Sequence, residues 1–193
     1  MTEWSRVKWS QAQQVLTVLG EAGDPGDDVG APPQAYFDAL VRAGRLHQAV
    51  QFLAQALPRH EAVAWAARSV NRLQAVRGGN SPGAQENADA LKAALLWVQD
   101  PSEPRRRKAF AAAELCRDTT GERLAAMAAF FSGGSIAPPD CQPVTAPRDA
   151  AGRFAAGAIL VAAGGGPSAI EALHVCLADG AELAARGLGG PAA

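Results

Sequence analysis

Apolar residues recur every three or four positions along most of this chain, which is the spacing of residues on one face of an α-helix. About eight Ala-rich segments of this kind follow one another between Ser10 and Gly187, and no segment of comparable length alternates as a β-strand does. Pro, Gly and capping residues separate most of these segments. The pattern predicts an all-α protein, folded as a single-domain bundle or as a short irregular stack of antiparallel helix pairs.

Local signals indicate where these helices begin and end. Ser10 and Gln13 have the spacing of a capping box, and Gly20 is suited to end the helix that they begin. Thr119 and Glu122 have the same capping-box spacing. Helices are expected over about residues 11–19, 34–41, 46–57, 62–73, 85–99, 148–163 and 170–184, with two more that end near residues 118 and 131.

The first 33 residues differ from the rest of the chain. After the first helix, residues 21–33 combine Gly, Pro and Asp with almost no apolar side chain, so they are expected to be a flexible linker with solvated acids. Residues 34–187 form the expected helical core domain, and residues 188–193 a disordered tail. Within the core domain, the Gly- and Pro-rich residues 132–147 cannot be helical and predict a long loop.

Composition and charge exclude several classes of function. The chain of 193 residues is 48% apolar, which suffices for a buried core, and its formal net charge of -1 argues against non-specific binding of nucleic acid. Its three cysteines form no CxxC pair, and its N-terminus lacks the pattern of a signal peptide. Since no apolar stretch reaches the roughly 20 residues of a membrane span, the protein is expected to be soluble and cytoplasmic, without membrane contact.

No residue cluster has the spacing of a catalytic or metal site. The His-Glu pair that begins at His60 lacks the second histidine of a zinc-protease helix, and His47 and His174 lie far from it in the sequence. The FSGGS segment that contains Ser132 follows an expected helix, whereas the nucleophile of a hydrolase elbow follows a strand. The sequence therefore predicts no catalytic residue, no metal ligand and no cofactor.

Four consecutive cations are the unusual charge feature of the chain: Arg105, Arg106, Arg107 and Lys108. They lie at the start of an expected helix, where positive charge opposes the helix dipole at a cost of about 0.3–1 kcal/mol each. Two interpretations stay open. The cations form a solvated face near Glu103 and Glu114, or they form the charged rim of a surface that binds an acidic protein partner.

Two segments carry a resemblance to a known family. They are residues 50–66, VQFLAQALPRHEAVAWA, and residues 128–139, AAFFSGGSIAPP, the second of which contains the loop pattern F-x-SGGS-x-APP. The chain resembles an uncharacterised family of small helical bacterial proteins often encoded beside type VI secretion components, with the likeness covering about residues 46–163. The resemblance implies an accessory, adaptor or regulatory role at a secretion locus, and it implies no catalytic residue.

The expected function is that of a non-enzymatic accessory protein that binds another protein, such as an adaptor or chaperone of a secretion system. Two alternatives stay open: an enzyme with an unrecognised site near residues 132–147, or an immunity protein that neutralises a toxin. An enzyme should bring Ser132, Ser135, Asp140 or a histidine together in a pocket with perturbed pKa values. A binding module should instead show an apolar groove or patch, and its partner is expected to be a protein and not a nucleic acid.

Overall fold

The computed structural model describes residues 3–77, 83–164 and 167–189. Within these ranges nine α-helices follow one another without a β-strand, and residues 135 and 145 form an isolated bridge. The predicted all-α, single-domain fold is therefore confirmed. The helices are α1 (Ala12–Leu19), α2 (Pro33–Arg42), α3 (Leu46–Ala56), α4 (Arg59–Arg77), α5 (Ala84–Gln99), α6 (Glu103–Leu115), α7 (Gly121–Phe131), α8 (Ala150–Ala163) and α9 (Pro167–Arg186).

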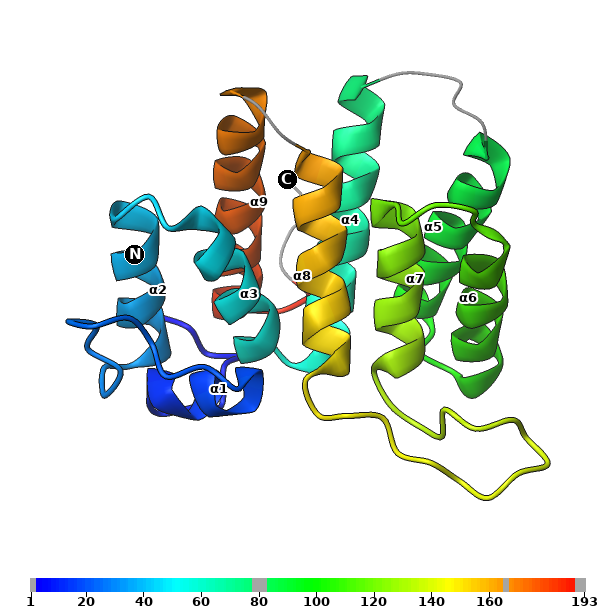
Figure 1. Cartoon of the computed structure of the whole chain (residues 1–193), viewed down its shortest axis with the longest axis horizontal. Coiled ribbons are helices and arrows are strands. Elements are labelled where there is room, and N and C mark those ends of the chain that lie inside the picture. Colours follow the sequence, from blue (N-terminus) through cyan, green and yellow to red (C-terminus); the bar gives the residue numbers. More distant parts are fainter. Residues whose placement is uncertain (1–2, 78–82, 165–166, 190–193) are drawn as a thin grey trace.

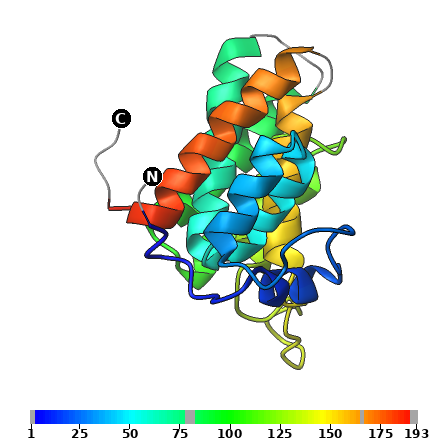
Figure 2. The same ribbon diagram turned by 90° about the vertical axis from the view of Figure 1, so that its left-hand side faces the viewer.

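Helices α4 and α8 lie side by side at the centre of the molecule (Figure 1). Helices α5 and α7 pack on one side of this pair, with α6 outermost, while α3 and α9 pack on the other side and α2 covers α3. Helix α1 crosses the lower ends of α2 and α3, as both views show (Figures 1 and 2). None of the helices in the described part of the chain has the length and apolar character that a membrane span requires.

Small side chains let the helices approach closely. More than half of the buried apolar residues in the described part of the chain are alanines, and the largest of its fully buried side chains belongs to Trp65 of α4. Its indole Nε1 donates a hydrogen bond to the backbone oxygen of Cys176 in α9 at 2.7 Å. Helix α9 has Gly180 against the same ring, where an added Cβ atom would lie 2.6 Å from Trp65 Cε2. The absence of a side chain at position 180 thus allows α9 to pack against α4.

Gly180→Ala is expected to lower the free energy of unfolding by about 1–3 kcal/mol, because the new methyl group overpacks the contact with Trp65. The better helix propensity of Ala, about 1 kcal/mol, offsets only part of this cost. Gly157→Ala in α8 is the control, since its new Cβ atom would meet Leu124 at an ordinary 3.4 Å. Urea denaturation measures the free energy of unfolding of both variants. If Gly180→Ala is as stable as Gly157→Ala, the close packing of α9 against Trp65 is contradicted.

The helix starts differ slightly from those expected. The capping box of α1 uses Gln11 and Gln14 in place of Ser10 and Gln13, and the N-cap of α7 is Thr120 in place of Thr119. In both cases the neighbouring residue has a polar side chain that also suits a cap, so spacing alone does not choose between them. Gly20 ends α1 with φ of 74°, as predicted.

The segment between α1 and α2 is bound to the rest of the domain. The backbone oxygens of Val29 and Ala31 accept hydrogen bonds from the start of α1, at 2.8 and 2.9 Å. Asp24 and Asp27 pair with Arg45 at 2.8 and 2.5 Å. The expectation that these acids are simply solvated is wrong, because their partner lies about twenty residues further along the chain, where no local pattern reveals it.

The expected tail at residues 188–193 lies mostly outside the described residues. Its described beginning includes Leu188, which is partly buried and packs against the core. The backbone N–H of Gly187 donates to the oxygen of Leu183 at 2.7 Å, directly after α9. The ordered chain therefore extends at least to this point.

Residues 132–147 form the predicted non-helical loop, which joins α7 to α8 (Figure 1). The backbone N–H of Ile136 donates to the oxygen of Val144 at 2.9 Å, so the two halves of the loop are paired. The hydroxyl oxygen of Ser135 accepts hydrogen bonds from the N–H groups of Ala137 and Val144 at 3.1 and 3.0 Å. The loop therefore has an internal structure of its own.

Candidate functional site

Arg106 connects three parts of the molecule. It lies in α6 and is only 3% exposed, with its guanidinium carbon 4.7 Å from the centre of the Phe130 ring. The guanidinium donates to the backbone oxygens of Phe130 at 2.5 Å and of Ser135 at 2.7 Å. It also pairs with the carboxylate of Glu103 at 2.6 Å. Arg106 thus joins α6 to the end of α7 and to the loop that follows α7.

Glu103 explains how the start of α6 tolerates its positive charges. It is the first residue of the helix, and Arg107 also donates to its carboxylate, at 2.9 Å. Hydrogen bonds from Arg106 and then Arg107 lower the pKa of Glu103 to about 2, so its negative charge persists at neutral pH. Arg107 makes a further bond to the backbone oxygen of Ser135 at 2.7 Å. The unfavourable position of the cations is therefore offset within the protein itself.

The two remaining cations have different surroundings. Arg105 pairs with Asp100 at 3.1 Å and donates to a backbone oxygen near the end of α5, while Lys108 is exposed. The expectation of one continuous charged rim is wrong for Arg106, which is buried because its guanidinium holds backbone oxygens. A contact between a partner and Arg105, Arg107 or Lys108 stays a prediction.

A pocket of about 390 Å³ lies next to Arg106, and we call it the loop pocket. Four segments meet there: the starts of α4 and α6, the end of α5 and the first residues after α7. The sequence placed the cation cluster and the SGGS segment in separate regions, and the fold brings members of both together. The pocket is lined by Arg59, His60, Trp97, Pro101, Glu103, Arg106, Ser132, Gly133 and Gly134.

His60 and Trp97 contact each other in the loop pocket. Their rings meet edge to face with centroids 5.4 Å apart. His60 Nε2 lies 2.9 Å from the backbone oxygen of Val98, and since an oxygen of this kind only accepts, Nε2 is assigned the proton. Trp97 is 4% exposed, and its buried indole N–H has no hydrogen-bond partner among the described residues. Leaving such a donor unsatisfied costs about 1–3 kcal/mol. The indole nitrogen itself is enclosed by the protein, so a ligand in the pocket does not reach it.

Cations outnumber carboxylates among the residues that line the loop pocket. Arg59, the first residue of α4, is exposed and donates to the backbone oxygen of Ser132 at 3.2 Å. Helix α6 also begins here, and the side chain of its N-cap, Ser102, makes no capping bond within the described structure. The N–H groups of a first helical turn lack internal partners and bear partial positive charge, and α6 has one fewer of them because its second residue, Pro104, has no N–H. Because Glu103 and Arg106 cancel each other, the charge of Arg59 and of the two helix starts remains.

The arrangement does not activate a nucleophile. The structure brings Ser132 and His60 into the same pocket, but the Ser132 hydroxyl donates to the backbone oxygen of Ala129 at 2.7 Å, and His60 Nε2 is bound to a backbone oxygen as well. A serine nucleophile needs a base within hydrogen-bond reach. Ser135 holds backbone groups of its own loop, and Asp140 is exposed and does not line the pocket.

Sequence reasoning missed Arg59 and Trp97 as members of a site. Each lies on an ordinary helical pattern, and the partial signal was the presence of Pro58 and Pro101, which place two helix starts near these residues. The other histidines, His47 and His174, are exposed on α3 and α9. Over the ranges that the structure describes, no group of three or more His, Cys, Asp or Glu residues could hold a metal ion.

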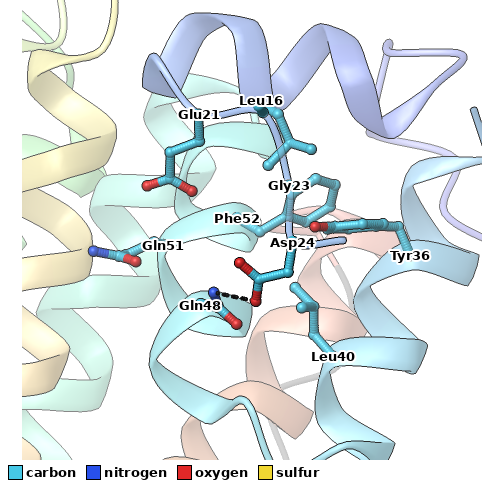
Figure 3. Close-up of a pocket in the computed structure, with 10 residues that line it drawn as sticks. Leu16, Glu21, Gly23, Asp24, Tyr36, Leu40, Gln48, Gln51 and Phe52 are labelled. Atoms are coloured by element: carbon cyan, nitrogen blue, oxygen red, sulfur yellow. Dashed lines mark hydrogen bonds between the residues drawn. The ribbon is translucent and has the colours of Figure 1, made fainter. Parts of the chain in front are cut away.

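A second pocket, of about 280 Å³, lies between α1, the segment after it and helices α2 and α3 (Figure 3). Figure 3 shows the Asp24 carboxylate pointing toward the Gln48 amide, which donates to it at 3.2 Å. Asp24 also accepts from Arg45, and the Tyr36 hydroxyl donates to Asp27 at 2.8 Å. These polar groups already bind one another and fasten the segment between α1 and α2, so this pocket is a weaker candidate for ligand binding than the loop pocket.

Acid is expected to destabilise the protein through Asp27. Hydrogen bonds from Arg45 lower the pKa of Asp27 from 3.8 to about 2. A carboxyl whose pKa is lower in the folded state contributes stability above its unfolded pKa and loses it as the pH falls through the folded pKa. This group alone should lower the free energy of unfolding by about 1–2 kcal/mol between roughly pH 5 and pH 2.

Denaturation of an Arg45→Gln variant at several pH values measures this contribution. The variant should be less stable than the unmodified protein at pH 7, and the difference should shrink toward pH 2, because Asp27 is then about half protonated in the unmodified protein and has lost most of the stability it contributes. Arg42→Gln is the control, since the Arg42 side chain is exposed and bonds only a backbone oxygen of its own helix. A constant difference between Arg45→Gln and the unmodified protein across this pH range would contradict the assignment.

Comparison with known protein families matches residues 36–184 to a family of unknown function, DUF6931. The matched residues make up most of the chain, which therefore belongs to this family. They extend from α2 to α9 and include all the segments that form the loop pocket. Neither the curated proteins nor the solved structures contain a match to the chain.

Proposed function

We propose that this DUF6931 protein is a non-enzymatic accessory protein that binds another protein through the loop pocket. The observation behind the proposal is that the pocket offers groups for binding without an activated group for catalysis. Exposed Arg59 and the starts of α4 and α6 border the pocket, and the side chains of His60 and Trp97 line it. Its hydroxyl and imidazole groups are instead bonded to backbone oxygens.

Exposed apolar side chains on the same segments favour a protein as the ligand. Leu96, next to Trp97 in α5, is 40% exposed, and Val144, in the loop after α7, is 48% exposed. Protein interfaces combine apolar contacts of this kind with a small number of specific polar anchors. These two side chains belong to α5 and to the loop after α7, the same segments that supply Trp97 and Gly133 to the loop pocket.

The resemblance to proteins encoded beside type VI secretion components gives this proposal its finer form. In that form the protein is a cytoplasmic bacterial adaptor or chaperone for a secreted effector or a sheath component. An immunity protein would bind its toxin in the same way, since it too binds one partner through a surface of complementary shape. An enzyme with a site near residues 132–147 is the alternative from another class, and it requires Ser132 or His60 to exchange its backbone partner for a substrate.

Site-specific photo-crosslinking in the native host tests the proposal. A photoreactive phenylalanine derivative fits at Gly133, because no described atom lies within 4 Å of a Cβ atom built there. The same residue at His174, exposed on α9, is the control. We expect a defined protein adduct from position 133 that is absent from position 174 and lost when Arg59→Glu is added. If position 133 gives no adduct beyond that of position 174, the loop pocket is not a protein-binding site.

A further inference from the structure

We infer that residues 138–145, the exposed tip of the loop between α7 and α8, form a preordered recognition element that inserts into an aromatic-lined groove of a partner protein. We call these residues the loop tip. The inference goes beyond the loop pocket, which residues 132–134 of the same loop line, and it rests on the proposed function only in taking the partner to be a protein. It depends on the length of the loop, on its internal order and on the chemistry of its exposed surface.

The connection between α7 and α8 is longer than the packing of these helices requires. The two helices pack directly against each other, and the chain from Phe131 to Ala150 joins them. Neighbouring antiparallel helices are commonly joined by about 2–8 residues, and connections longer than about 12–15 residues are mostly either functional or disordered. This loop extends beyond the ends of the helices that it joins in both views (Figures 1 and 2). Its order, described next, favours a function.

The base of the loop is fastened to the helices. Arg106 and Arg107 both donate to the backbone oxygen of Ser135, each at 2.7 Å. Ala137 and Ala146, which flank the loop tip, are buried, with 9% and 6% of their surface exposed. Both ends of the loop tip therefore start from fixed positions, and the pairing of residues 136 and 144 extends this order toward the tip.

The loop tip contains a turn of its own. The backbone N–H of Cys141 donates to the oxygen of Pro138 at 3.1 Å, so residues 138–141 form a β-turn. Pro139 takes the second position of this turn, where the fixed φ of proline suits it. Pro143 follows, and each proline reduces the freedom that the chain would otherwise lose on binding. The loop tip therefore has a defined shape before a partner binds.

This order does not serve burial at the loop tip. Each of residues 138–145 is exposed, including the apolar Val144. Ordering a segment costs conformational entropy, and burial of its side chains normally offsets that cost. Here the side chains are presented to solvent on an ordered backbone, which is the arrangement expected of a binding loop on a rigid scaffold.

The composition of the loop tip indicates the kind of partner. Three of its eight side chains are proline rings, and proline-rich segments bind in grooves lined by aromatic side chains. Asp140 is its single charged residue, so the groove is expected to place a cation opposite this carboxylate. The absence of Lys and Arg from residues 138–145 argues against nucleic acid or an anionic membrane as the partner.

Photo-crosslinking of the full-length protein in its native host tests the contact. A photoreactive phenylalanine derivative replaces Gln142 of the loop tip, and the same residue at His174 on α9 is the control. We expect a protein adduct from position 142 that is absent from position 174, that Asp140→Lys removes and that Asp118→Lys retains, since Asp118 is exposed between α6 and α7. The inference is overturned if position 142 gives no such adduct, or if the adduct survives Asp140→Lys.

NMR of the protein with ¹³C-labelled proline tests the aromatic groove. The probe is the purified protein identified in the adduct at position 142, and Pro139→Ala and Pro143→Ala identify the two signals of interest. These ring signals should move upfield on binding, because atoms above the face of an aromatic ring are shielded. In the same titration Asp140→Lys should raise Kd roughly tenfold or more, while Asp118→Lys stays within about twofold. Binding that leaves both ring signals in place would overturn the assignment of an aromatic groove.

Ser135→Ala tests whether the order of the loop tip matters for binding. It removes the acceptor of the N–H groups of Ala137 and Val144 and leaves each side chain of the loop tip unchanged. We expect faster hydrogen exchange at Val144 and roughly fivefold weaker binding of the same partner. Ser168→Ala, at an exposed position in the first turn of α9, should change neither. Faster exchange with unchanged affinity would contradict a preordered recognition element.

The inference and the proposed function can fail separately. If position 133 gives its adduct and position 142 gives none, the loop pocket binds protein and the loop tip does not. If position 142 gives an adduct with the expected dependence on Asp140 and position 133 gives none, the loop tip is the binding element and the loop pocket is not.

Discussion

Replacement of Arg106 by Met is expected to lower the free energy of unfolding by about 2–4 kcal/mol. The methionine side chain keeps much of the apolar volume over the Phe130 ring. It cannot donate, so the backbone oxygens of Phe130 and Ser135 lose charge-assisted bonds of 2.5 and 2.7 Å in a region where Arg106 is 3% exposed. The free energy of unfolding, measured by urea denaturation, reports the loss.

Lys108→Met is the matched control for this prediction. Lys108 belongs to the same cationic run and the same helix, but it is exposed, so its replacement should change stability by no more than about 0.5 kcal/mol. If Arg106→Met and Lys108→Met lower the free energy of unfolding by similar amounts, Arg106 acts only through its charge at the start of α6. Arg106 would then not be the residue that connects α6, α7 and the loop.

Trp65→Ala is expected to cost about 3–5 kcal/mol, because it leaves a cavity where α4 meets α9. For a domain of this size such a loss lowers the melting temperature by roughly 10 °C. Trp65→Phe keeps most of the ring but loses the bond to Cys176, so its melting temperature should lie between those of the other two proteins. Thermal unfolding followed by circular dichroism distinguishes the three. If the melting temperature of Trp65→Ala lies within a degree or two of that of the unmodified protein, the contact of Trp65 with α9 does not contribute strongly to stability.

The helical architecture was readable from the sequence because it depends on local periodicity. Apolar spacing predicted about eight helical segments and their approximate limits, close to the nine helices of the described residues, and glycines such as Gly20 marked their ends. Errors of one residue at the starts of α1 and α7 arose where two polar residues in a row can both cap a helix. Tertiary packing determines which of the two residues caps the helix, and local spacing carries no information about that packing.

The loop pocket could not be derived in the same way. Its lining comes from segments around residues 59, 100 and 133, and their meeting depends on how α4, α5, α6 and α7 pack. The burial of Arg106 was equally hidden, because its partners are backbone oxygens about 25–30 positions away, and any residue type could supply them. The pairing of Asp27 with Arg45 is a further example, since charges separated this far show no helical spacing.

The most direct test of the central claim is the affinity of the purified protein for the partner captured at position 133. Calorimetric titration compares the unmodified protein with Arg59→Glu and with Arg68→Glu, which places the same charge change elsewhere on the exposed side of α4. If the loop pocket is the binding site, Arg59→Glu raises Kd at least roughly tenfold and Arg68→Glu leaves it within about twofold. If Arg59→Glu and Arg68→Glu bind the partner as tightly as the unmodified protein does, the loop pocket is not where this protein binds.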